Sequence, residues 1–159
     1  MKMNFKDAMS CIPNSVSIVA AYVEGQVVGC TISSLVSVDV ESPKVLFVLK
    51  NDSSTLRALS SASIFSISVL AENQRSIALD FSSAAKETSL VSWSVQDDGS
   101  LLLDNSLVSF SCKVEELHVQ GSASIVIGSV VSQRFLTTLK PLIYSFRAFG
   151  TFTDQNGEI

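Results

Sequence analysis

The sequence has few of the residues on which the common nucleotide-binding loops depend. Among its 159 residues there are only 7 glycines, 3 prolines and a single histidine. The glycines are scattered, so neither G-x-x-x-x-G-K-[ST] nor G-x-G-x-x-G occurs, which excludes a P-loop and a Rossmann dinucleotide fingerprint. One histidine cannot build a histidine-based metal cluster or relay, so we expect no metal site. We predict that His118 lies on a strand with its ring at the surface.

Charge is also scarce, and it is evenly spread. Charged residues make up 16% of the chain, and the formal net charge is −4. Neither half is basic, so nucleic acid and anionic lipid surfaces are poor partner candidates. The longest apolar runs, such as Val45–Leu49, are far shorter than the roughly 20 residues that a membrane span needs. We therefore expect one soluble domain, residues 1–159, with no membrane partner.

Cysteine is rare as well, and its positions fit no common framework. Cys11, Cys30 and Cys112 lie far apart in the chain, and no C-x-x-C occurs. An odd number of widely spaced cysteines argues against both a disulfide scaffold and a zinc site. The first residues also lack the uninterrupted apolar segment of a secretory signal. We expect a reducing compartment, the cytoplasm.

Short β-branched and aromatic runs recur along the chain, with turn signals between them. Two of these runs flank Glu24-Gly25, which predicts a hairpin with glycine at a positive φ. In a third run Val36, Val38 and Val40 alternate with other residues and form one apolar face. The predicted strands are Val16–Val23, Gln26–Ile32, Leu35–Val40, Lys44–Leu49, Ile64–Leu70, Leu107–Val114, Ser124–Val131 and Leu142–Phe149. This pattern is typical of an all-β barrel or sandwich.

Two helices are predicted between these strands. Thr55–Ser61 follows several N-cap candidates, and Glu72–Phe81 begins with an acidic first turn. From Ser82 to Asn105 no periodic pattern is visible, which predicts a long loop. A loop of this length in a small domain is usually functional or packs against a partner.

Serine is abundant, with 29 residues, and two hydroxyl clusters adjoin predicted strands. Thr31–Ser37 follows a strand end, where hydroxyls and N–H groups suit a flat, heteroatom-rich ligand. Lys50–Thr55 opens a helix, where N–H groups and the helix dipole favour a phosphate. Asp52 opposes an anion there, and Lys50 and Arg57 offset it. The same residue types cap helices and end strands in proteins without ligands, so a purely structural interpretation stays open.

Eight short motifs follow one another between Ile12 and Phe149. They are Gly29-x-Thr31-x-Ser33-Ser34-x-x-Ser37-Val38, Ser42-Pro43-x-x-Leu46, Asn51-x-x-Ser54-Thr55, Phe65-x-Ile67-x-Val69-Leu70 with Gln74 and Phe81, Trp93-Ser94-Val95, Cys112-Lys113-Val114, Gly128-x-Val130 and Pro141-Leu142-Ile143-Tyr144. In this order they resemble the flavin reductase-like family, the small reductase components of two-component flavin monooxygenases. Each motif alone is weak, and their shared order carries the resemblance.

The resemblance implies a mainly β fold, a split β-barrel of Greek-key type with two or three short helices, working as a homodimer. It implies that FMN or FAD binds near the subunit interface, that NADH or NADPH delivers hydride to it, and that a partner monooxygenase receives the reduced flavin. Carried over residue by residue, it assigns the flavin ring edge and ribityl chain to Thr31, Ser33, Ser34 and Ser37. It assigns the flavin phosphate to Lys50, Asn51, Ser54 and Thr55, with Phe81 and Lys86 as further contacts.

The chain departs from the family pattern at two places, of which one is the run Ser145-Phe146-Arg147-Ala148-Phe149, where a glycine is usual soon after the Leu-x-Tyr segment. The other departure bears more directly on function. Where the family commonly has Gly-Asp-His, this chain has Gly121-Ser122-Ala123. The family's histidine is associated with the nicotinamide side of the site, so the departure concerns the pyridine nucleotide more than the flavin. The main reading is an NAD(P)H-dependent flavin reductase. The alternatives are a non-enzymatic flavin-binding or electron-transfer protein of the same fold, and a β-barrel interaction module without a cofactor.

Overall fold

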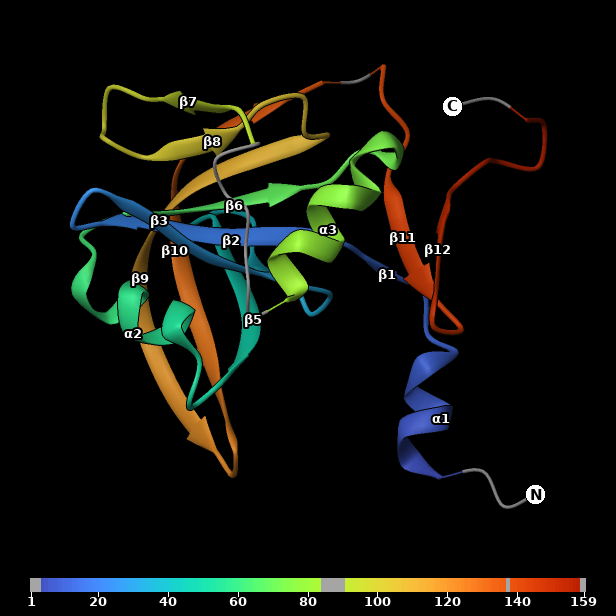
Figure 1. The fold of residues 1–159 in the computed structure, drawn as a ribbon, viewed down its shortest axis with the longest axis horizontal. Helices are drawn as coiled ribbons and strands as arrows, with labels where there is room; N and C mark the ends of the chain where they lie inside the picture. The colour runs from blue at the N-terminus through green and yellow to red at the C-terminus, as the bar shows by residue number, and fades with distance from the viewer. Residues whose placement is uncertain (1–3, 84–90, 137, 158–159) are drawn as a thin grey trace.

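The chain is built around a seven-stranded antiparallel sheet (Figure 1). The computed structural model describes residues 4–83, 91–136 and 138–157. The strands of this sheet are β2 (Ser17–Val23), β3 (Gln26–Ile32), β4 (Val36–Asp39), β5 (Lys44–Lys50), β6 (Phe65–Val69), β9 (Val108–Gln120) and β10 (Ala123–Phe135). Their order is β3-β2-β6-β9-β10-β5-β4. The predicted mainly β class is confirmed, and the hairpin at Glu24-Gly25 is present with both residues at positive φ.

The sheet curls until strands from its two ends meet. β3 and β5 contact each other although they are not neighbours in the sheet. Between them the Val48 N–H donates a hydrogen bond of 3.0 Å to the Ser34 hydroxyl. Within the described part of the chain no β-ladder joins these two strands, so a seam remains in the wall. This arrangement is consistent with the predicted split barrel.

Two short helices pack on the sheet, close to where they were predicted. α2 (Ser54–Ser61) buries Ala58 and Leu59 in the barrel core, which also contains Phe47, Phe65 and Ile67. α3 (Arg75–Ser82) follows a 3-10 turn, η1 (Glu72–Gln74). It buries its apolar side in a second cluster, formed by Val16, Ile18, Ala20, Leu70, Ala78, Phe81, Leu103 and Leu142. Of the helices in the described residues, none combines the length and apolar character needed to cross a bilayer.

A smaller sheet lies beside the barrel. It consists of β1 (Asn14–Ser15), β11 (Leu142–Ser145) and β12 (Ala148–Thr151), and it packs with the N-terminal helix α1 (Phe5–Ser10), which the sequence did not predict. The prediction of one strand over Leu142–Phe149 is wrong. The chain turns back at Phe146 and Arg147, whose φ angles are 50° and 58°. Turns of this kind usually contain asparagine or glycine, so two bulky residues gave no turn signal.

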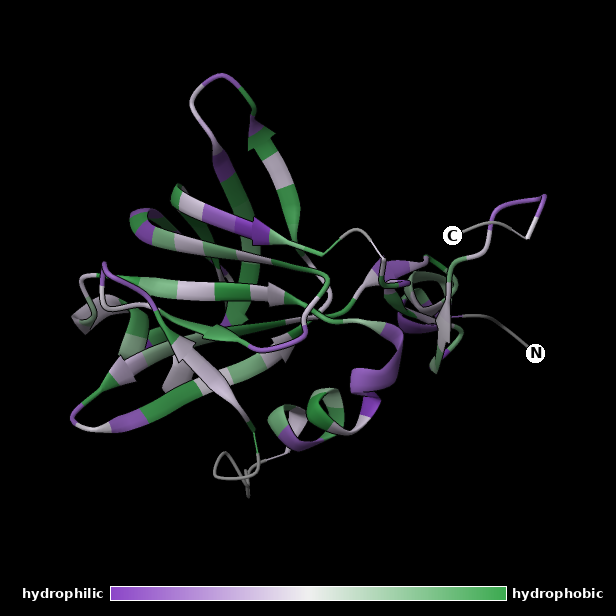
Figure 2. Ribbon diagram, turned by 90° about the horizontal axis from the view of Figure 1, so that it is seen from above, coloured by the Kyte–Doolittle hydropathy of each residue, from purple (hydrophilic) through white to green (hydrophobic). Residues whose placement is uncertain are grey.

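The prediction of an unstructured loop from Ser82 to Asn105 is also wrong. β7 (Trp93–Val95) and β8 (Leu101–Leu103) form a hairpin that covers one face of β6 and β9. That face is polar, because two cross-strand serine pairs, Ser66–Ser111 and Ser68–Ser109, lie buried on it. Figure 2 shows that hydrophobic and more polar segments both occur along the strands of the fold. Because β7 and β8 pack on a face that contains serines, their sequences need not alternate apolar and polar residues. No strand pattern was therefore visible in the sequence there.

The valines of the apolar face predicted for residues 35–40 are not buried in the single chain, and Val40 follows the end of β4. Val36, Val38 and Val40 are 55%, 49% and 83% exposed. His118 lies on β9, as predicted for a strand residue at the surface. Its ring is exposed and lies 2.6 Å from a Glu116 carboxylate oxygen.

Candidate functional site

A cavity of about 460 Å³ lies at the seam of the barrel. It is lined by residues at and just after the end of β3, by the end of β5, by the N-cap of α2 and by two residues of α3. The lining residues are Cys30, Thr31, Ile32, Ser33, Ser34, Val48, Leu49, Lys50, Ser53, Phe81 and Ser82. Five of them were predicted as site residues, so the structure brings together two clusters that lie about 20 positions apart in the chain.

The hydroxyl groups on the β3 side have different partners. The Thr31 hydroxyl donates a hydrogen bond of 2.6 Å to the Ala78 carbonyl oxygen on α3, so towards a ligand it can only accept. The Ser34 hydroxyl accepts from the Val48 N–H and keeps its own proton to donate. Ser33 is exposed and lines the cavity. Ser37 lies on the exposed strand β4 and does not line the cavity, so its predicted role stays a prediction.

The opposite end of the cavity is suited to an anion. Lys50 lines it, and α2 begins there with its first N–H groups unpaired within the helix. The N-cap is Ser53, whose hydroxyl accepts from the Leu56 N–H at 3.0 Å. Ser53 belongs to the hydroxyl cluster noted in the sequence, but the resemblance assigned the phosphate to Ser54 and Thr55 and not to Ser53. Ser54 is exposed, whereas Thr55 is only 1% exposed, so the Thr55 hydroxyl is closed off from a ligand.

Asn51 has a structural role that the sequence did not reveal. Its side-chain amide donates to the Gly121 carbonyl oxygen at 3.0 Å and accepts from the Ser124 hydroxyl at 2.7 Å. Its backbone N–H donates to the Ser122 carbonyl oxygen at 3.1 Å. These bonds tie the end of β5 to the β9–β10 turn. A separate cavity, lined by Lys50, Asn51, Asp52 and Ser122, lies beside this turn and shares Lys50 with the cavity at the seam. Contact between Asn51 and a phosphate stays a prediction.

The cavity at the seam has an aromatic residue, Phe81, as its floor. Phe81 is 1% exposed and packs edge-on against Trp93, with ring centroids 6.0 Å apart. It is present among the lining residues, as the sequence analysis expected. Lys86 lies outside the described residues.

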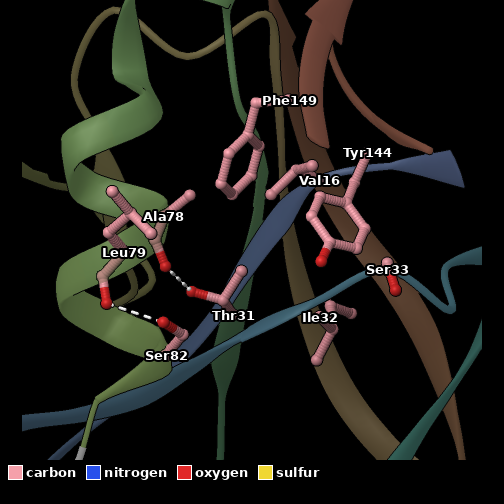
Figure 3. A pocket seen from close by; sticks show the side chains of 9 residues that line it. All are labelled: Val16, Thr31, Ile32, Ser33, Ala78, Leu79, Ser82, Tyr144 and Phe149. Atoms are coloured by element: carbon pink, nitrogen blue, oxygen red, sulfur yellow. Dashed lines mark hydrogen bonds between the residues drawn. The ribbon is translucent and has the colours of Figure 1, made fainter. Parts of the chain in front are cut away.

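An apolar cavity of about 250 Å³ continues from the first one and shares Thr31, Ile32, Ser33 and Ser82 with it. Figure 3 shows Tyr144 and Phe149 on one side of it, and Ala78 and Leu79 of α3 on the other. The rings of Tyr144 and Phe149 are 5.1 Å apart. Sequence reasoning missed these residues, because they come from β11, β12 and α3, which only the fold brings to β3.

The electrostatics of this continuous groove are simple. Within the described residues, Lys50 is the one charged side chain that lines either of the two cavities. Burial raises the pKa of the Cys112 thiol, which lies outside the groove, to about 12, so this thiol is inert. In the same part of the chain, histidine, cysteine, aspartate and glutamate form no group of three that could hold a metal ion. The groove can bind and orient a planar, phosphorylated molecule beside a second planar group, and it presents no paired acid and base.

Comparison with known proteins finds a matching family and relatives over nearly the whole chain. Residues 9–153 match the flavin reductase like domain. FMN reductase (NADH) SmoA of Agrobacterium fabrum is 28% identical over 152 residues, which cover 96% of this chain and 87% of that protein. The reductase component of 4-hydroxyphenylacetate 3-monooxygenase of Thermus thermophilus is 26% identical over 149 residues, covering 94% and 95%.

A solved structure shares the fold. It is the NADH:FAD oxidoreductase SgcE6 of Streptomyces globisporus in complex with NAD and FAD fragments, with a TM-score of 0.88 and 22% identity. The match covers 94% of this chain and 92% of that chain. The family match spans nearly the whole barrel, including both ends of the groove and the strands that line it. The protein therefore belongs to the flavin reductase like domain family.

Proposed function

We propose that this protein is an NAD(P)H-dependent flavin reductase, which reduces FMN or FAD by hydride transfer and supplies reduced flavin to a partner monooxygenase. The family match and the names of its relatives support this activity. The observation that carries it is the groove itself. Two adjoining cavities, one with a cation and a helix start and one with apolar walls, suit two ligands that must lie in contact.

The residues present fit a phosphorylated flavin. Lys50 and the first N–H groups of α2 would hold its phosphate. Thr31, Ser33 and Ser34 would contact the ring edge and the ribityl chain, and Ser37 would lie close behind them. Phe81 supplies an apolar floor. Asn51, Ser54 and Thr55 would act at the phosphate end, Asn51 mainly by fixing the turn beside it.

The chain's own part in the reaction is to bind, orient and exclude water. When bound, the flavin accepts the hydride that the nicotinamide gives up, so the protein need not supply an acid or base. The hydroxyls of Ser33 and Ser34 can donate hydrogen bonds that fix the ring in one orientation. The apolar walls formed by Tyr144, Phe149 and Leu79 keep water from the adjoining cavity, which suits the nicotinamide ring.

Flavin-dependent oxidation of the pyridine nucleotide tests this proposal. Purified protein is mixed with NADH or NADPH, and FMN, FAD or riboflavin is added while the near-ultraviolet absorbance of the reduced nicotinamide is followed. We expect oxidation that depends on both protein and flavin. Absence of oxidation with every combination would contradict the proposal.

The turn at Gly121-Ser122-Ala123 favours one other candidate, a flavin-binding or electron-transfer protein that does not use a pyridine nucleotide. Ala123 pairs with Lys50 in the sheet, so the residues that replace the family's Gly-Asp-His lie at the phosphate end of the groove. Tightly bound flavin that a protein donor reduces, but neither NADH nor NADPH reduces, would favour this candidate. Rapid NADH oxidation would remove it.

The protein is further proposed to act as a homodimer. Val36, Val38 and Val40 expose an apolar strand face, and contiguous exposed apolar surface is typical of protein interfaces. The dimer would cover this face of β4. Light scattering at micromolar concentration tests it, and a monomeric mass would contradict it. We also place the protein in the cytoplasm, a reducing compartment, because Cys11, Cys30 and Cys112 form no disulfide.

A further inference from the structure

Asp104 joins the two strands of the β7–β8 hairpin at their open end. Its carboxylate accepts a hydrogen bond of 2.6 Å from the Ser92 hydroxyl and another from the Ser94 hydroxyl. Its backbone N–H donates to the Ser92 carbonyl oxygen at 3.1 Å. Arg134 of β10 places its guanidinium 3.8 Å from the same carboxylate. Asp104 lines neither cavity of the groove.

Asp104 also connects the hairpin to the start of α3. Its carbonyl oxygen accepts a hydrogen bond of 2.9 Å from the side-chain amide of Gln74, which directly precedes the helix. The other end of that amide accepts from the Ala71 N–H at 3.0 Å. Gln74 is 5% exposed, so both bonds are shielded from water. Losing one of them would leave a buried polar group without a partner, which is costly.

The same hairpin contacts the other end of the helix. Trp93 of β7 packs against Phe81, which lies in the last turn of α3 and forms the floor of the larger cavity. The hairpin therefore touches α3 just before its first residue and again near its last. Between these points α3 supplies Ala78 and Leu79 to the apolar cavity.

The hairpin is itself fixed to the sheet by hydroxyl groups. The Leu103 N–H donates to the Ser68 hydroxyl at 3.2 Å, and the Ser109 hydroxyl donates to the same oxygen at 3.0 Å. The Ser106 hydroxyl donates to the Leu103 carbonyl oxygen at 2.9 Å and lies 2.7 Å from the Ser109 hydroxyl. A hairpin tied down in this way is a rigid support for a helix that packs on it.

We propose that Asp104 is a positioning residue, which holds the β7–β8 hairpin where Gln74 and Trp93 fix α3 as one wall of the groove. Ligand affinity then depends on a carboxylate that never touches the ligand, because a preformed wall avoids the entropic cost of ordering it on binding. The effect on flavin affinity rests on the proposed function. The effect on α3 does not.

The variant Asp104→Asn tests this, with Asp97→Asn as a matched control. Asp97 lies in the exposed turn of the same hairpin, and in the described part of the chain its side chain makes no hydrogen bond. Three quantities are measured well below the melting temperature: hydrogen exchange of the α3 amides, the emission of Trp93, which is the single tryptophan, and the dissociation constant of FMN.

For Asp104→Asn we expect exchange in α3 and the FMN dissociation constant to rise roughly tenfold, the scale of one lost charge-assisted hydrogen bond. We expect the emission maximum of Trp93 to shift to the red in Asp104→Asn. In Asp97→Asn the α3 exchange rates and the FMN dissociation constant should stay within twofold of wild type, and the emission maximum should not shift. Unchanged α3 exchange and FMN affinity in a folded Asp104→Asn protein, even with a lower melting temperature, would overturn the proposal. If this variant does not fold, Ser94→Ala removes one donor and takes its place. If wild-type protein binds no flavin, the proposed function fails, and α3 exchange and Trp93 emission still decide the role of Asp104.

Discussion

The Thr31 hydroxyl donates a hydrogen bond of 2.6 Å to the Ala78 carbonyl oxygen, and this bond crosses from β3 to α3 at the point where the two cavities of the groove meet. One side chain therefore lines both cavities and links the two elements that form their walls. Its proton is already used, so a ligand meets an oxygen with free lone pairs.

Two replacements of Thr31 distinguish the contribution of its hydroxyl group from that of its side-chain volume. Thr31→Val keeps the shape and loses the hydroxyl, so we expect flavin to bind roughly tenfold more weakly, on the scale of one lost hydrogen bond between the walls of the groove. Thr31→Ser keeps the hydroxyl and should stay within about threefold of wild type. Quenching of flavin fluorescence measures both affinities. Equal affinities for the two variants would show that the hydroxyl is not used.

Lys50 is expected to distinguish phosphorylated from unphosphorylated flavin. Lys50→Gln removes the cation at the phosphate end of the groove, so FMN binding should weaken roughly tenfold, the scale of one charge-assisted hydrogen bond. Riboflavin has no phosphate and should bind to this variant as it does to wild type. Lys113→Gln, an exposed position on β9, is the control for the change in net charge. Equal losses for FMN and riboflavin would place Lys50 away from the phosphate.

The carboxyl of Asp98 makes stability sensitive to acid. Burial alone would raise its pKa, but hydrogen bonds from Ser100 and Ser111, each at 2.6 Å from a hydroxyl, outweigh this and hold the pKa below 3.8. Because the folded-state pKa is the lower one, the stabilisation is present above pH 3.8 and is lost as the pH falls through the folded-state value.

The urea midpoint of unfolding as a function of pH tests the contribution of Asp98. The wild-type midpoint should fall more steeply than that of Asp98→Asn as the pH drops below about 4, and the two curves should converge in acid. Ser111→Ala removes one donor and should give an intermediate slope. Parallel curves for wild type and Asp98→Asn would exclude this contribution.

The turn between β11 and β12 holds two bulky residues in the left-handed region. Phe146 has φ of 50° and is 71% exposed, so replacement loses little packing in the single chain. Phe146→Asn should raise the free energy of unfolding by about 1 kcal/mol, because asparagine tolerates this conformation better. Phe152→Asn, an exposed position at negative φ, is the control and should bring no gain. Urea denaturation measures both, and equal changes would argue against backbone strain.

The parts of the fold that could be predicted are those with a strong local signal. Apolar, β-branched runs on either side of a glycine turn defined β2 and β3, and N-cap residues defined the start of α2 to within one position. The β7–β8 hairpin could not be predicted, because its strands pack on buried serines such as Ser68 and Ser109 and have no apolar period. The second turn of the small sheet was missed because Phe146 and Arg147 stand where glycine is usual.

Of the residues in the candidate site, those next to a recognisable strand or helix end could be predicted, and those brought in by the tertiary fold could not. The hydroxyl cluster of β3 and the cation Lys50 were predicted, since each adjoins a recognisable element end. Tyr144 and Phe149 were not, because only the antiparallel return of β12 beside β11 brings them to β3. Asn51 was assigned to the ligand. Its hydrogen bonds to Gly121 and Ser124 show that it also fixes the β9–β10 turn, a role that the sequence could not show because these residues lie about 70 positions away.

The seam between β3 and β5 has a consequence for the stability of the folded chain. A molecule bound there would contact both β3 and β5, which no β-ladder joins among the described residues. Binding to the folded state alone raises the apparent stability with ligand concentration. A flavin that leaves the groove after its reduction would therefore take this added stability with it.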